Sequence, residues 1–232
     1  MSDLCPPSAV PTGTSLPGIV SGERLRRALN VVVAVLGLVV AAPVMLVVAL
    51  LIKLDSRGPV IYTQRRVGLD RRGGRPAPPG CRRTTDMGGR LFTMYKFRTM
   101  TTAPASTEER WATKDDVRVT RVGRFLRATR LDELPQLVNV LKGDMNIVGP
   151  RPEQPTIFQE LRRELGGYHE RQKVLPGITG WAQVNLGYDT SVDDVKKKVE
   201  LDLEYIQRRS ASKDLEIMAK TMPVMVFRKV WN

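Results

Sequence analysis

Residues 28–52 read ALNVVVAVLGLVVAAPVMLVVALLI, and this stretch contains no charged side chain. Asn30 is its one strongly polar residue. An apolar run of about 25 residues is long enough to cross the roughly 30 Å hydrocarbon core of a bilayer as a helix. We therefore predict a membrane helix over residues 23–54.

The residues that flank this run are informative about its topology. Basic residues lie on both sides of it, namely Arg24, Arg26 and Arg27 before it and Lys53, Arg57, Arg65 and Arg66 after it. The positive-inside tendency favours a cytoplasmic position for both ends. Pro43 removes one helix hydrogen bond and permits a kink. A re-entrant helix that breaks at Pro43 is the prediction, and a single span stays open because spanning helices tolerate proline.

A cleaved signal peptide is the rival interpretation of the same run. The run is longer than the apolar core of a signal peptide, and no convincing small-residue cleavage site precedes the folded part. Residues 1–22 are rich in Pro, Ser, Gly and Thr and have no apolar period, so we predict a disordered tail there.

Two short strands are predicted after the apolar run. Residues 58–68 and 91–100 alternate β-branched or aromatic residues with polar ones, which is typical of strands in a small β-hairpin. Residues 70–90, between them, are rich in Arg, Gly and Pro. This composition favours a flexible surface loop, and contact with phosphate or lipid is the alternative.

The remainder of the chain is mainly helical by its pattern. Helices are predicted over residues 118–127, 132–142, 156–165, 192–208 and 214–231, with Gly143 as a stop signal for the second. The last helix gathers apolar residues near one face, namely Leu215, Met218, Met222, Met225 and Val226. An interfacial amphipathic helix and a core-packing helix both fit this face. The predicted fold class is α+β, mainly helical.

The charge of the chain predicts an anionic partner, since its formal net charge is +13. Nucleic acid, anionic lipid and a phosphorylated substrate all fit this charge. His169 is the single histidine, which argues against a Ser-His-Asp triad or a histidine-rich metal site. Cys5 and Cys81 show no metal-ligand spacing. The chemistry must therefore rest on carboxylates and cations.

The strongest local signal is the acidic pair Asp132 and Glu133, which precedes Pro135 at a predicted helix start. Asp is a favoured N-cap and Pro is tolerated in the first turn, so we expect both carboxylates at the positive end of a helix dipole. That position keeps a carboxylate ionised and offers backbone donors to a phosphate oxygen. A nucleophilic carboxylate and an anionic substrate can share such a site, although acidic caps are commonplace.

Cations surround this pair in the sequence. Arg127 and Arg130 precede it, Arg151 follows it, and the strand segment at 95–98 adds Lys96 and Arg98. Forked arginines and a divalent cation can neutralise an anion that approaches a carboxylate. Mg²⁺ suits the site, with oxygen ligands from Asp132, Glu133 or both. Read singly, each basic residue fits a solvated surface charge better than a binding role.

Four ordered blocks carry a family resemblance. They are YKFRTM at 95–100, DELPQ at 132–136, GPRPE at 149–153 and PGITGWAQVN at 176–185. Over about residues 24–230 the chain resembles the bacterial sugar transferases, and within them a subgroup linked to secreted exopolysaccharide. These are monotopic polyprenyl-phosphate hexose-1-phosphate transferases that begin exopolysaccharide, capsule and O-antigen assembly.

The resemblance implies a reaction and a place for it. Hexose-1-phosphate moves from a UDP-sugar to undecaprenyl (polyprenyl) phosphate with release of UMP, through an aspartyl-phosphosugar. The implied location is the cytoplasmic face of the bacterial cytoplasmic (inner) membrane. Residues 23–54 form the re-entrant helix, and 55–232 form the catalytic domain with amphipathic helices at the phospholipid interface.

The resemblance also implies roles for individual residues. Asp132 matches the nucleophile, and Glu133 matches the partner carboxylate that is associated with Mg²⁺ and proton handling. Lys96, Arg127 and Arg151 match basic phosphate-handling positions, to which we add Arg98. Pro43 matches the helix-breaking proline.

The chain departs from the family pattern at two places. Ala42 stands where the family usually has Ser before the proline, so a serine hydrogen bond that supports the bend does not transfer to this chain. Leu186 follows Asn185 where many members continue with Gly-Arg, so a nucleotide contact of that arginine does not transfer. Asp202 keeps the family's acidic helix position, and we assign it at most structural or substrate-site support.

Three alternatives to this function stay open. A membrane-anchored nucleic-acid-binding module fits the charge, but aromatics make up only 6% of the chain and the arginines cluster around an acidic helix start, so no nucleic acid partner is predicted. A non-catalytic scaffold is a second alternative, which the intact acidic pair argues against. Direct transfer with the carboxylate as a base is the third. The identity of the sugar, the length of the polyprenyl chain, and the choice between monomer and homodimer stay open.

Overall fold

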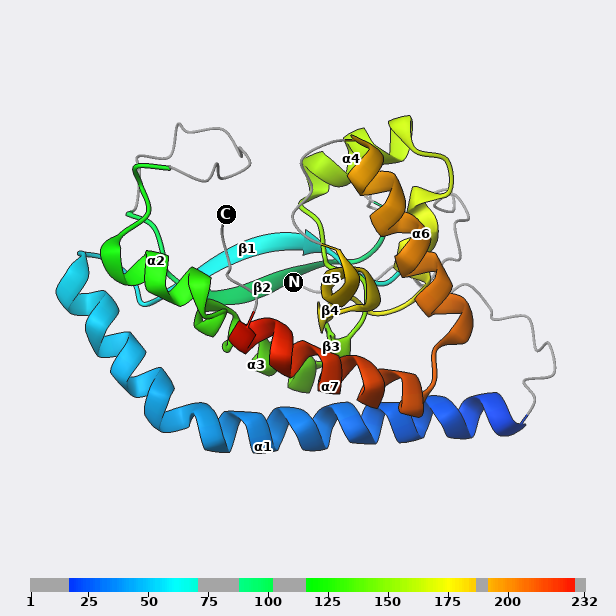
Figure 1. The fold of residues 1–232 in the computed structure, drawn as a ribbon, viewed down its shortest axis with the longest axis horizontal. Coiled ribbons are helices and arrows are strands. Elements are labelled where there is room, and N and C mark those ends of the chain that lie inside the picture. The colour runs from blue at the N-terminus through cyan, green and yellow to red at the C-terminus, as the bar shows by residue number, and fades with distance from the viewer. Residues whose placement is uncertain (1–16, 71–87, 102–115, 187–191, 228–232) are drawn as a thin grey trace, which may run out of the picture.

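The computed structural model describes residues 17–70, 88–101, 116–186 and 192–227. The prediction of a mainly helical α+β fold is confirmed: one long helix lies under a body of shorter helices and two small sheets (Figure 1). In chain order the elements are α1 (Pro17–Asp55), β1 (Ile61–Val67), β2 (Leu91–Phe97), α2 (Arg121–Ala128), η1 (Leu131–Glu133), α3 (Gln136–Lys142), β3 (Asn146–Val148), α4 (Pro155–Glu164), η2 (Tyr168–Lys173), β4 (Gly177–Thr179), α5 (Trp181–Asn185), α6 (Val192–Arg208) and α7 (Ala211–Phe227).

Helix α1 is the one helix in the described residues that is long and apolar enough to cross a membrane, over Gly22–Asp55. Only 11% of its most apolar window is buried in the protein. The large apolar side chains that it leaves exposed are Leu25, Val32, Val35, Leu36, Val39, Val40, Val44, Leu46, Val47, Leu50, Leu51 and Leu54. So large an exposed apolar surface marks contact with an apolar environment and associates this helix with a membrane.

The structure corrects two predictions about the N-terminal part of the chain. Helix α1 begins at Pro17, so residues 17–22 belong to it and not to a tail; residues 1–16 lie outside the described residues. The helix also continues through Pro43 and is not broken there. A proline removes only its own N–H from the hydrogen-bond ladder, so the turns on either side persist and the helix bends (Figure 1).

The predicted β-hairpin is confirmed. Strands β1 and β2 pair antiparallel, with Ile61 opposite Phe97 and Val67 opposite Leu91. The pairing extends past the strands, because the N–H of Gly68 donates to the carbonyl of Arg90 and the N–H of Arg90 donates to that of Leu69. The insert predicted over 70–90 therefore leaves the hairpin at a hydrogen-bonded base, and its residues 71–87 lie outside the described residues.

A second sheet was not predicted from the sequence. Strands β3 and β4 pair in parallel, with Asn146 opposite Gly177 and Val148 opposite Thr179. The backbones approach so closely that a Cβ on Gly177 would lie 2.1 Å from the backbone N of Gly149. Glycine is required at such a contact because any side chain would collide with the neighbouring strand.

Helix α1 and the body share their apolar cores. Ala34 of α1 belongs to the main buried cluster with Phe92, Met94, Leu137, Val140, Met145, Ile147, Val148, Tyr205 and Ile217. Val48 and Ile52 form a second cluster with Phe97 and Leu126. The predicted domain boundary between residues 54 and 55 therefore lies at the end of α1. It does not separate two hydrophobic cores, because α1 packs into the cores of the body.

Several helix predictions are confirmed within a few residues. Helix α6 has the predicted bounds, and α3 ends at Gly143, which has a left-handed φ of 79°. Helix α7 has features of both predicted types, the core-packing helix and the interfacial amphipathic helix. Ile217 is fully buried in the main cluster, while Leu215 and Met222 are 51% and 65% exposed.

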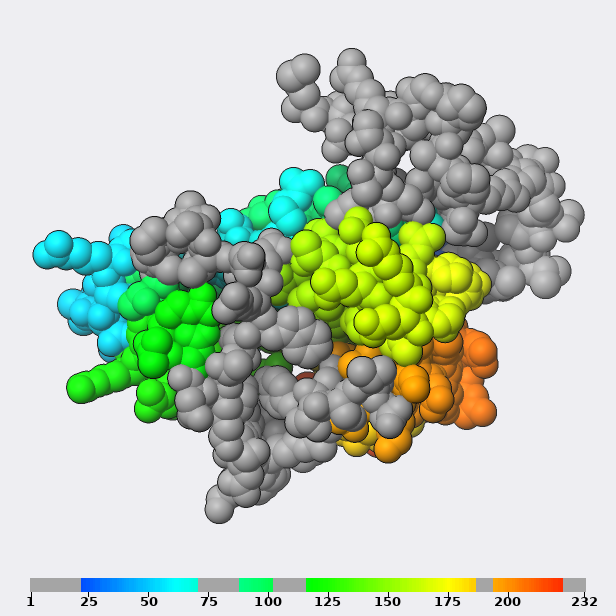
Figure 2. Space-filling view, turned by 90° about the horizontal axis from the view of Figure 1, so that it is seen from above, coloured from blue at the N-terminus to red at the C-terminus, as the bar shows by residue number. Residues whose placement is uncertain are grey.

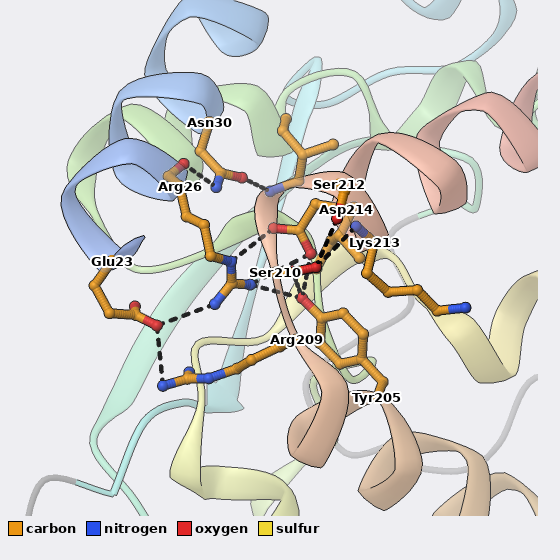
Figure 3. A network of polar contacts seen from close by, with 11 residues as sticks. Glu23, Arg26, Asn30, Tyr205, Arg209, Ser210, Ser212, Lys213 and Asp214 are labelled. Atoms are coloured by element: carbon orange, nitrogen blue, oxygen red, sulfur yellow. Dashed lines mark hydrogen bonds and ion pairs between the residues drawn. The ribbon is translucent and has the colours of Figure 1, made fainter. Parts of the chain in front are cut away.

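A buried polar network ties the start of α1 to the turn between α6 and α7 (Figure 3). Arg26 Nε donates to Asp214 Oδ2 at 2.9 Å, and its Nη2 donates to the Tyr205 hydroxyl at 2.8 Å. That hydroxyl donates in turn to Asp214 Oδ1 at 2.7 Å. Asn30 Oδ1 accepts from the N–H of Ile147 at 2.5 Å. These polar side chains thus hold the basic N-terminal part of α1 against the body.

The face of the body turned away from α1 carries β1, α2, α4 and α6 (Figure 2). Helix α2 lies beside the far end of α1, where the bent helix rises toward the hairpin (Figure 1). A Cβ on Gly123 of α2 would lie 2.0 Å from the carbonyl oxygen of Thr99, so α2 packs directly on the segment that follows β2. This packing fixes the position of α2, which directly precedes the turn that carries Asp132 and Glu133.

Candidate active site

Glu133 is the centre of a cluster of cations from three parts of the chain. Its Oε1 accepts from Lys96 Nζ of β2 and from Arg151 Nη2 of the loop after β3, each at 2.9 Å. Arg130 Nη1 lies 3.7 Å from the same oxygen. The side chain of Glu133 is 8% exposed. The structure thus brings together three of the predicted site residues, Glu133, Lys96 and Arg151.

Side chains along β2 point alternately to its two faces, and this places Lys96 at the Glu133 cluster. Phe92 and Met94 are buried in the main core, so Lys96, two residues further, lies on the same face of the strand. Asn139 of α3 holds the strand in position, because its Oδ1 accepts from the N–H of Tyr95 at 3.0 Å and its Nδ2 donates to the carbonyl of Thr93 at 2.7 Å. The turn that precedes α3 is therefore held against β2.

The carboxylate of Asp132 differs from that of its neighbour. Asp132 is 7% exposed, and among the described residues its carboxylate accepts no hydrogen bond and forms no ion pair. Its predicted position as a helix N-cap is wrong, because Asp132 lies inside the η1 turn and Pro135 is the N-cap of α3. Glu133 neutralises its cations directly, and Asp132 keeps its oxygens available for another partner.

The electrostatics separate the two carboxyl groups. Burial raises the pKa of Asp132, and the negative charge of Glu133 raises it further against the opposing charges of Lys96 and Arg151. Burial also raises the pKa of Glu133, but the charges of Arg151, Lys96 and Arg130 outweigh it and hold that pKa well below its usual range. Burial lowers the pKa of Lys96, and Glu133 opposes this. The negative charge is therefore favoured on Glu133, and Asp132 is the harder of the two carboxyl groups to ionise.

Arg130 is a site residue that the sequence argument named only as a neighbour. Its φ of 59° makes it the one non-glycine residue with positive φ among the described residues. Arg130 takes this left-handed conformation between α2 and η1, and η1, which carries the acidic pair, lies against β2. No sequence signal marks it, because a left-handed arginine has no characteristic pattern.

The structure places Arg98 and Arg127 apart from this cluster. Arg98 is buried, and its Nη2 donates to the carbonyl of Ser56 at 2.6 Å and to that residue's Oγ at 2.9 Å. The same Nη2 donates to the carbonyl of Ile52 in the last turn of α1 at 3.4 Å, so Arg98 holds the end of the helix and the residue that follows it. In the described residues, the side chain of Arg127 makes no hydrogen bond or ion pair with Asp132 or Glu133. The phosphate-binding predictions for Arg98 and Arg127 stay predictions.

A shallow hollow lies next to the Glu133 cluster. It is lined by Arg66, Met94, Lys96, Gln136, Arg151 and Pro152. Arg66 Nη1 donates to the carbonyl of Pro152 at 3.0 Å, so a further cation from β1 reaches this hollow. From the sequence, Arg66 was only a flanking charge, because the strand register that places it opposite Phe92 was not predicted.

The acidic pair fits a magnesium ion that takes few protein ligands. The described residues contain no cluster of three or more His, Cys, Asp or Glu side chains that could hold a metal. Mg²⁺ commonly uses only one or two carboxylates together with substrate phosphates and water. Asp132 has oxygens free for this among the described residues, whereas Oε1 of Glu133 is already shared by cations. The fit is therefore better at Asp132.

The arrangement is suited to nucleophilic attack on an anionic group. Among the described residues, a carboxylate that accepts no hydrogen bond lies beside fixed cations, which can stabilise negative charge on an incoming phosphate. The described residues supply no second unpaired carboxylate in this cluster to compete for that role. The geometry favours Asp132 as the nucleophile and Glu133 as the residue that orients Lys96 and Arg151.

Comparison with known proteins places these residues in a larger group. The bacterial sugar transferase family model matches residues 21–228. A UDP-N-acetylgalactosamine-undecaprenyl-phosphate N-acetylgalactosaminephosphotransferase of Aeromonas hydrophila is 42% identical over 198 residues, which is 85% of this chain and 43% of that protein. A UDP-glucose:undecaprenyl-phosphate glucose-1-phosphate transferase of Escherichia coli (strain K12) is 41% identical over 211 residues, 90% of this chain and 41% of that protein.

A relative of more similar length is found in Caulobacter vibrioides. This UDP-glucose:undecaprenyl-phosphate glucose-1-phosphate transferase is 38% identical over 216 residues, 92% of this chain and 74% of that protein. The chain thus spans about two fifths of the length of the Aeromonas and Escherichia relatives and most of the Caulobacter one. The similarity in each case includes the segments that carry the Glu133 cluster.

Proposed function

The chain belongs to the bacterial sugar transferase family, and from this premise we propose that it transfers a sugar-1-phosphate from a UDP-sugar to undecaprenyl phosphate. One observation carries the assignment to this site: the buried Asp132 carboxylate is unpaired among the described residues, while its neighbour Glu133 binds Lys96 and Arg151. This is the first membrane-bound step in assembling an exopolysaccharide, capsule or O-antigen.

The proposed reaction has two displacements at one phosphorus atom. A carboxylate oxygen of Asp132 attacks the phosphorus that carries the sugar, and the bond from this phosphorus to the bridging oxygen breaks. UMP leaves with the bridging oxygen, and the sugar phosphate is bound to Asp132 as an acyl phosphate. An oxygen of undecaprenyl phosphate then attacks the same phosphorus and breaks its bond to Asp132. The products are undecaprenyl-diphosphate-sugar and the regenerated carboxylate.

The cations of the site have distinct parts in this scheme. Lys96 and Arg151 stabilise the negative charge that shifts toward the leaving UMP. Glu133 keeps both in place, because one of its oxygens accepts from each. Magnesium, held by Asp132 and by diphosphate oxygens with Glu133 close by, would supply further charge neutralisation when bound.

The function is tested by UMP release from a panel of UDP-sugars, measured on the purified chain with Mg²⁺ and with or without undecaprenyl phosphate. We expect sustained release with one donor or a narrow set of donors, and only when the lipid acceptor is present. Release that does not depend on the acceptor would indicate a hydrolase. No release from any donor would favour a scaffold that recruits other polysaccharide enzymes.

The proposed location is the cytoplasmic face of the bacterial inner membrane, with α1 re-entrant. The basic flanks of α1 support it, as does its bend, because a single proline in a continuous helix changes its direction in the apolar region. The body then lies at the interface, where the exposed Leu215 and Met222 of α7 can contact lipid.

This topology predicts that both ends of α1 are labelled from the same side. Cysteine is introduced singly at Gly22, where an added Cβ meets nothing within 4 Å, or at the exposed Arg57, in a chain whose Cys5 and Cys81 are replaced by Ser. In intact cells, an impermeant maleimide should label neither site before the inner membrane is permeabilised and both sites afterwards. Labelling of one site alone in intact cells would instead establish a single span.

Glu133→Gln should lower the pH at which transfer begins to fail in acid. The negative charge of Glu133 is one of the causes that raise the pKa of Asp132, so removing it lowers that pKa and keeps Asp132 ionised to more acidic pH. The rate itself should fall about 10²-fold, since Lys96 and Arg151 lose their shared partner. The measurement is the acid limb of kcat against pH in both proteins. A limb that stays in place, or moves to higher pH, contradicts the proposed electrostatics.

The same variant tests which carboxylate holds the metal. A Mg²⁺ titration of transfer by Glu133→Gln should give an apparent metal affinity within about threefold of that of the unaltered chain if Asp132 is the main protein ligand. A loss of affinity of tenfold or more would assign Glu133 as a direct ligand.

A further inference from the structure

The loop from Gly149 to Glu153, which carries Arg151, has no regular secondary structure of its own. Its carbonyls are nevertheless bound one after another. The carbonyl of Pro150 accepts from the N–H of Gly177 at 2.9 Å, and that of Glu153 accepts from the N–H of Val67 at 2.9 Å. The carbonyls between them accept from arginine side chains, Pro152 from Arg66 at 3.0 Å and Arg151 from Arg171 at 3.1 Å.

Arg171 is the least exposed of these donors and the site chemistry does not use it. Its side chain is 1% exposed. Nε donates to Asp202 Oδ2 of α6 at 2.8 Å, Nη1 donates to the Tyr168 hydroxyl at 2.6 Å, and Nη2 donates to the carbonyl of Arg151. Three donors of one guanidinium thus connect α6, η2 and the loop.

A buried ion pair of this kind is poor evidence for stability alone. Removing two charges from water costs free energy that their attraction often fails to recover, so apolar replacements of similar volume are frequently neutral or stabilising. What the pair supplies is geometry, because a planar guanidinium with its carboxylate fixed can hold a third acceptor in one orientation. That acceptor is the backbone of Arg151, whose side chain reaches Glu133 at 2.9 Å.

We propose that Arg171, oriented by Asp202 and Tyr168, is a positioning residue that sets the Arg151 side chain in the transfer reaction. It acts through the backbone of the loop and touches neither substrate nor Glu133. The proposal rests on the proposed function for its kinetic part, and its structural part is independent of that function.

The test is a double-mutant cycle between Arg171→Met and Arg151→Gln. Alone, Arg171→Met should lower kcat by up to about 100-fold, because a small misplacement of a group that stabilises the transition state is costly. In the Arg151→Gln background the same change should lower kcat less than about twofold, since the residue it positions is already absent. If the two effects instead multiply, Arg171 does not act through Arg151 and the proposal is wrong.

The chain offers a matched control in the Arg26 network described above. It has the same composition, with Arg26 bonded to an aspartate and to a tyrosine hydroxyl, and lies where α1 meets α6 and α7. Arg26→Met should destabilise the chain, and whatever effect it has on kcat should multiply with that of Arg151→Gln. An effect of Arg26→Met that also vanishes in the Arg151→Gln background would show general destabilisation and overturn the proposal.

Two further measurements keep the test decisive if Arg171→Met folds poorly or the chain shows no transfer. Arg171→Met with Asp202→Leu removes both charges, so its thermal midpoint should exceed that of Arg171→Met while kcat stays low; recovery of both would indicate a structural role only. Hydrogen exchange at the amides of Gly177 and Val67, which donate to the carbonyls of Pro150 and Glu153 in this loop, needs no activity. It should speed up at least about tenfold in Arg171→Met and stay unchanged in Arg26→Met; unchanged exchange in both contradicts the positioning role.

Discussion

Asp132→Asn is expected to lower the rate of sugar phosphate transfer by at least about 10⁴-fold, which is the largest effect we predict for one substitution. The amide keeps the shape of the side chain but cannot attack phosphorus to form an acyl phosphate. Folding should be preserved, because the Asp132 carboxylate has no hydrogen bond or ion pair to lose among the described residues. Transfer of labelled sugar to undecaprenyl phosphate is the measurement.

Asp144→Asn is the matched control for this variant. Asp144 follows α3, and its carboxylate lies 3.9 Å from Lys142, outside the Glu133 cluster. Its replacement should leave transfer within about threefold of the unaltered rate. If Asp132→Asn retains more than a few per cent of the activity while Asp144→Asn retains all of it, Asp132 is not the nucleophile.

Arg151→Gln is expected to lower kcat about 10²- to 10³-fold, the usual cost of removing one fixed donor that stabilises a transition state. Glutamine can still donate one hydrogen bond but carries no charge, so Glu133 keeps Lys96 as its close cation. The effect should fall on kcat more than on KM, because the charge that Arg151 stabilises develops as the bond to UMP breaks. Steady-state kinetics with the UDP-sugar varied measures both.

Arg163→Gln serves as the control for the loss of one positive charge. Arg163 is exposed in the last turn of α4, and this substitution should change kcat by less than about twofold. A similar fall in both variants would mean that Arg151 contributes only to the overall positive field of the protein.

The sequence predicted the features that depend on local pattern. The apolar run, the alternation of the two hairpin strands and the stop at Gly143 each have a period or a residue type that produces the structure directly. Adjacent carboxylates followed by Pro135 identified the turn, although not its type. The η1 turn replaced the predicted N-cap because Arg130 enters a left-handed conformation just before it.

Features that depend on long-range packing were beyond the sequence argument. Strands β3 and β4 have three residues each, too short for an alternating pattern, and they pair across α4 and η2. Arg98 lies two residues from Lys96 and was grouped with it as a phosphate ligand. The end of α1 approaches the hairpin there and takes Arg98 as a cap, which only the packing of α1 on the body determines.

The measurement that tests the central claim most directly is the intact mass of the purified chain after incubation with its UDP-sugar and no lipid acceptor. We predict a mass increase equal to one sugar phosphate, located on Asp132, absent in Asp132→Asn and lost when undecaprenyl phosphate is added. Acceptor-dependent transfer at a normal rate with no adduct under rapid quenching would contradict the account and indicate direct transfer between the two bound substrates.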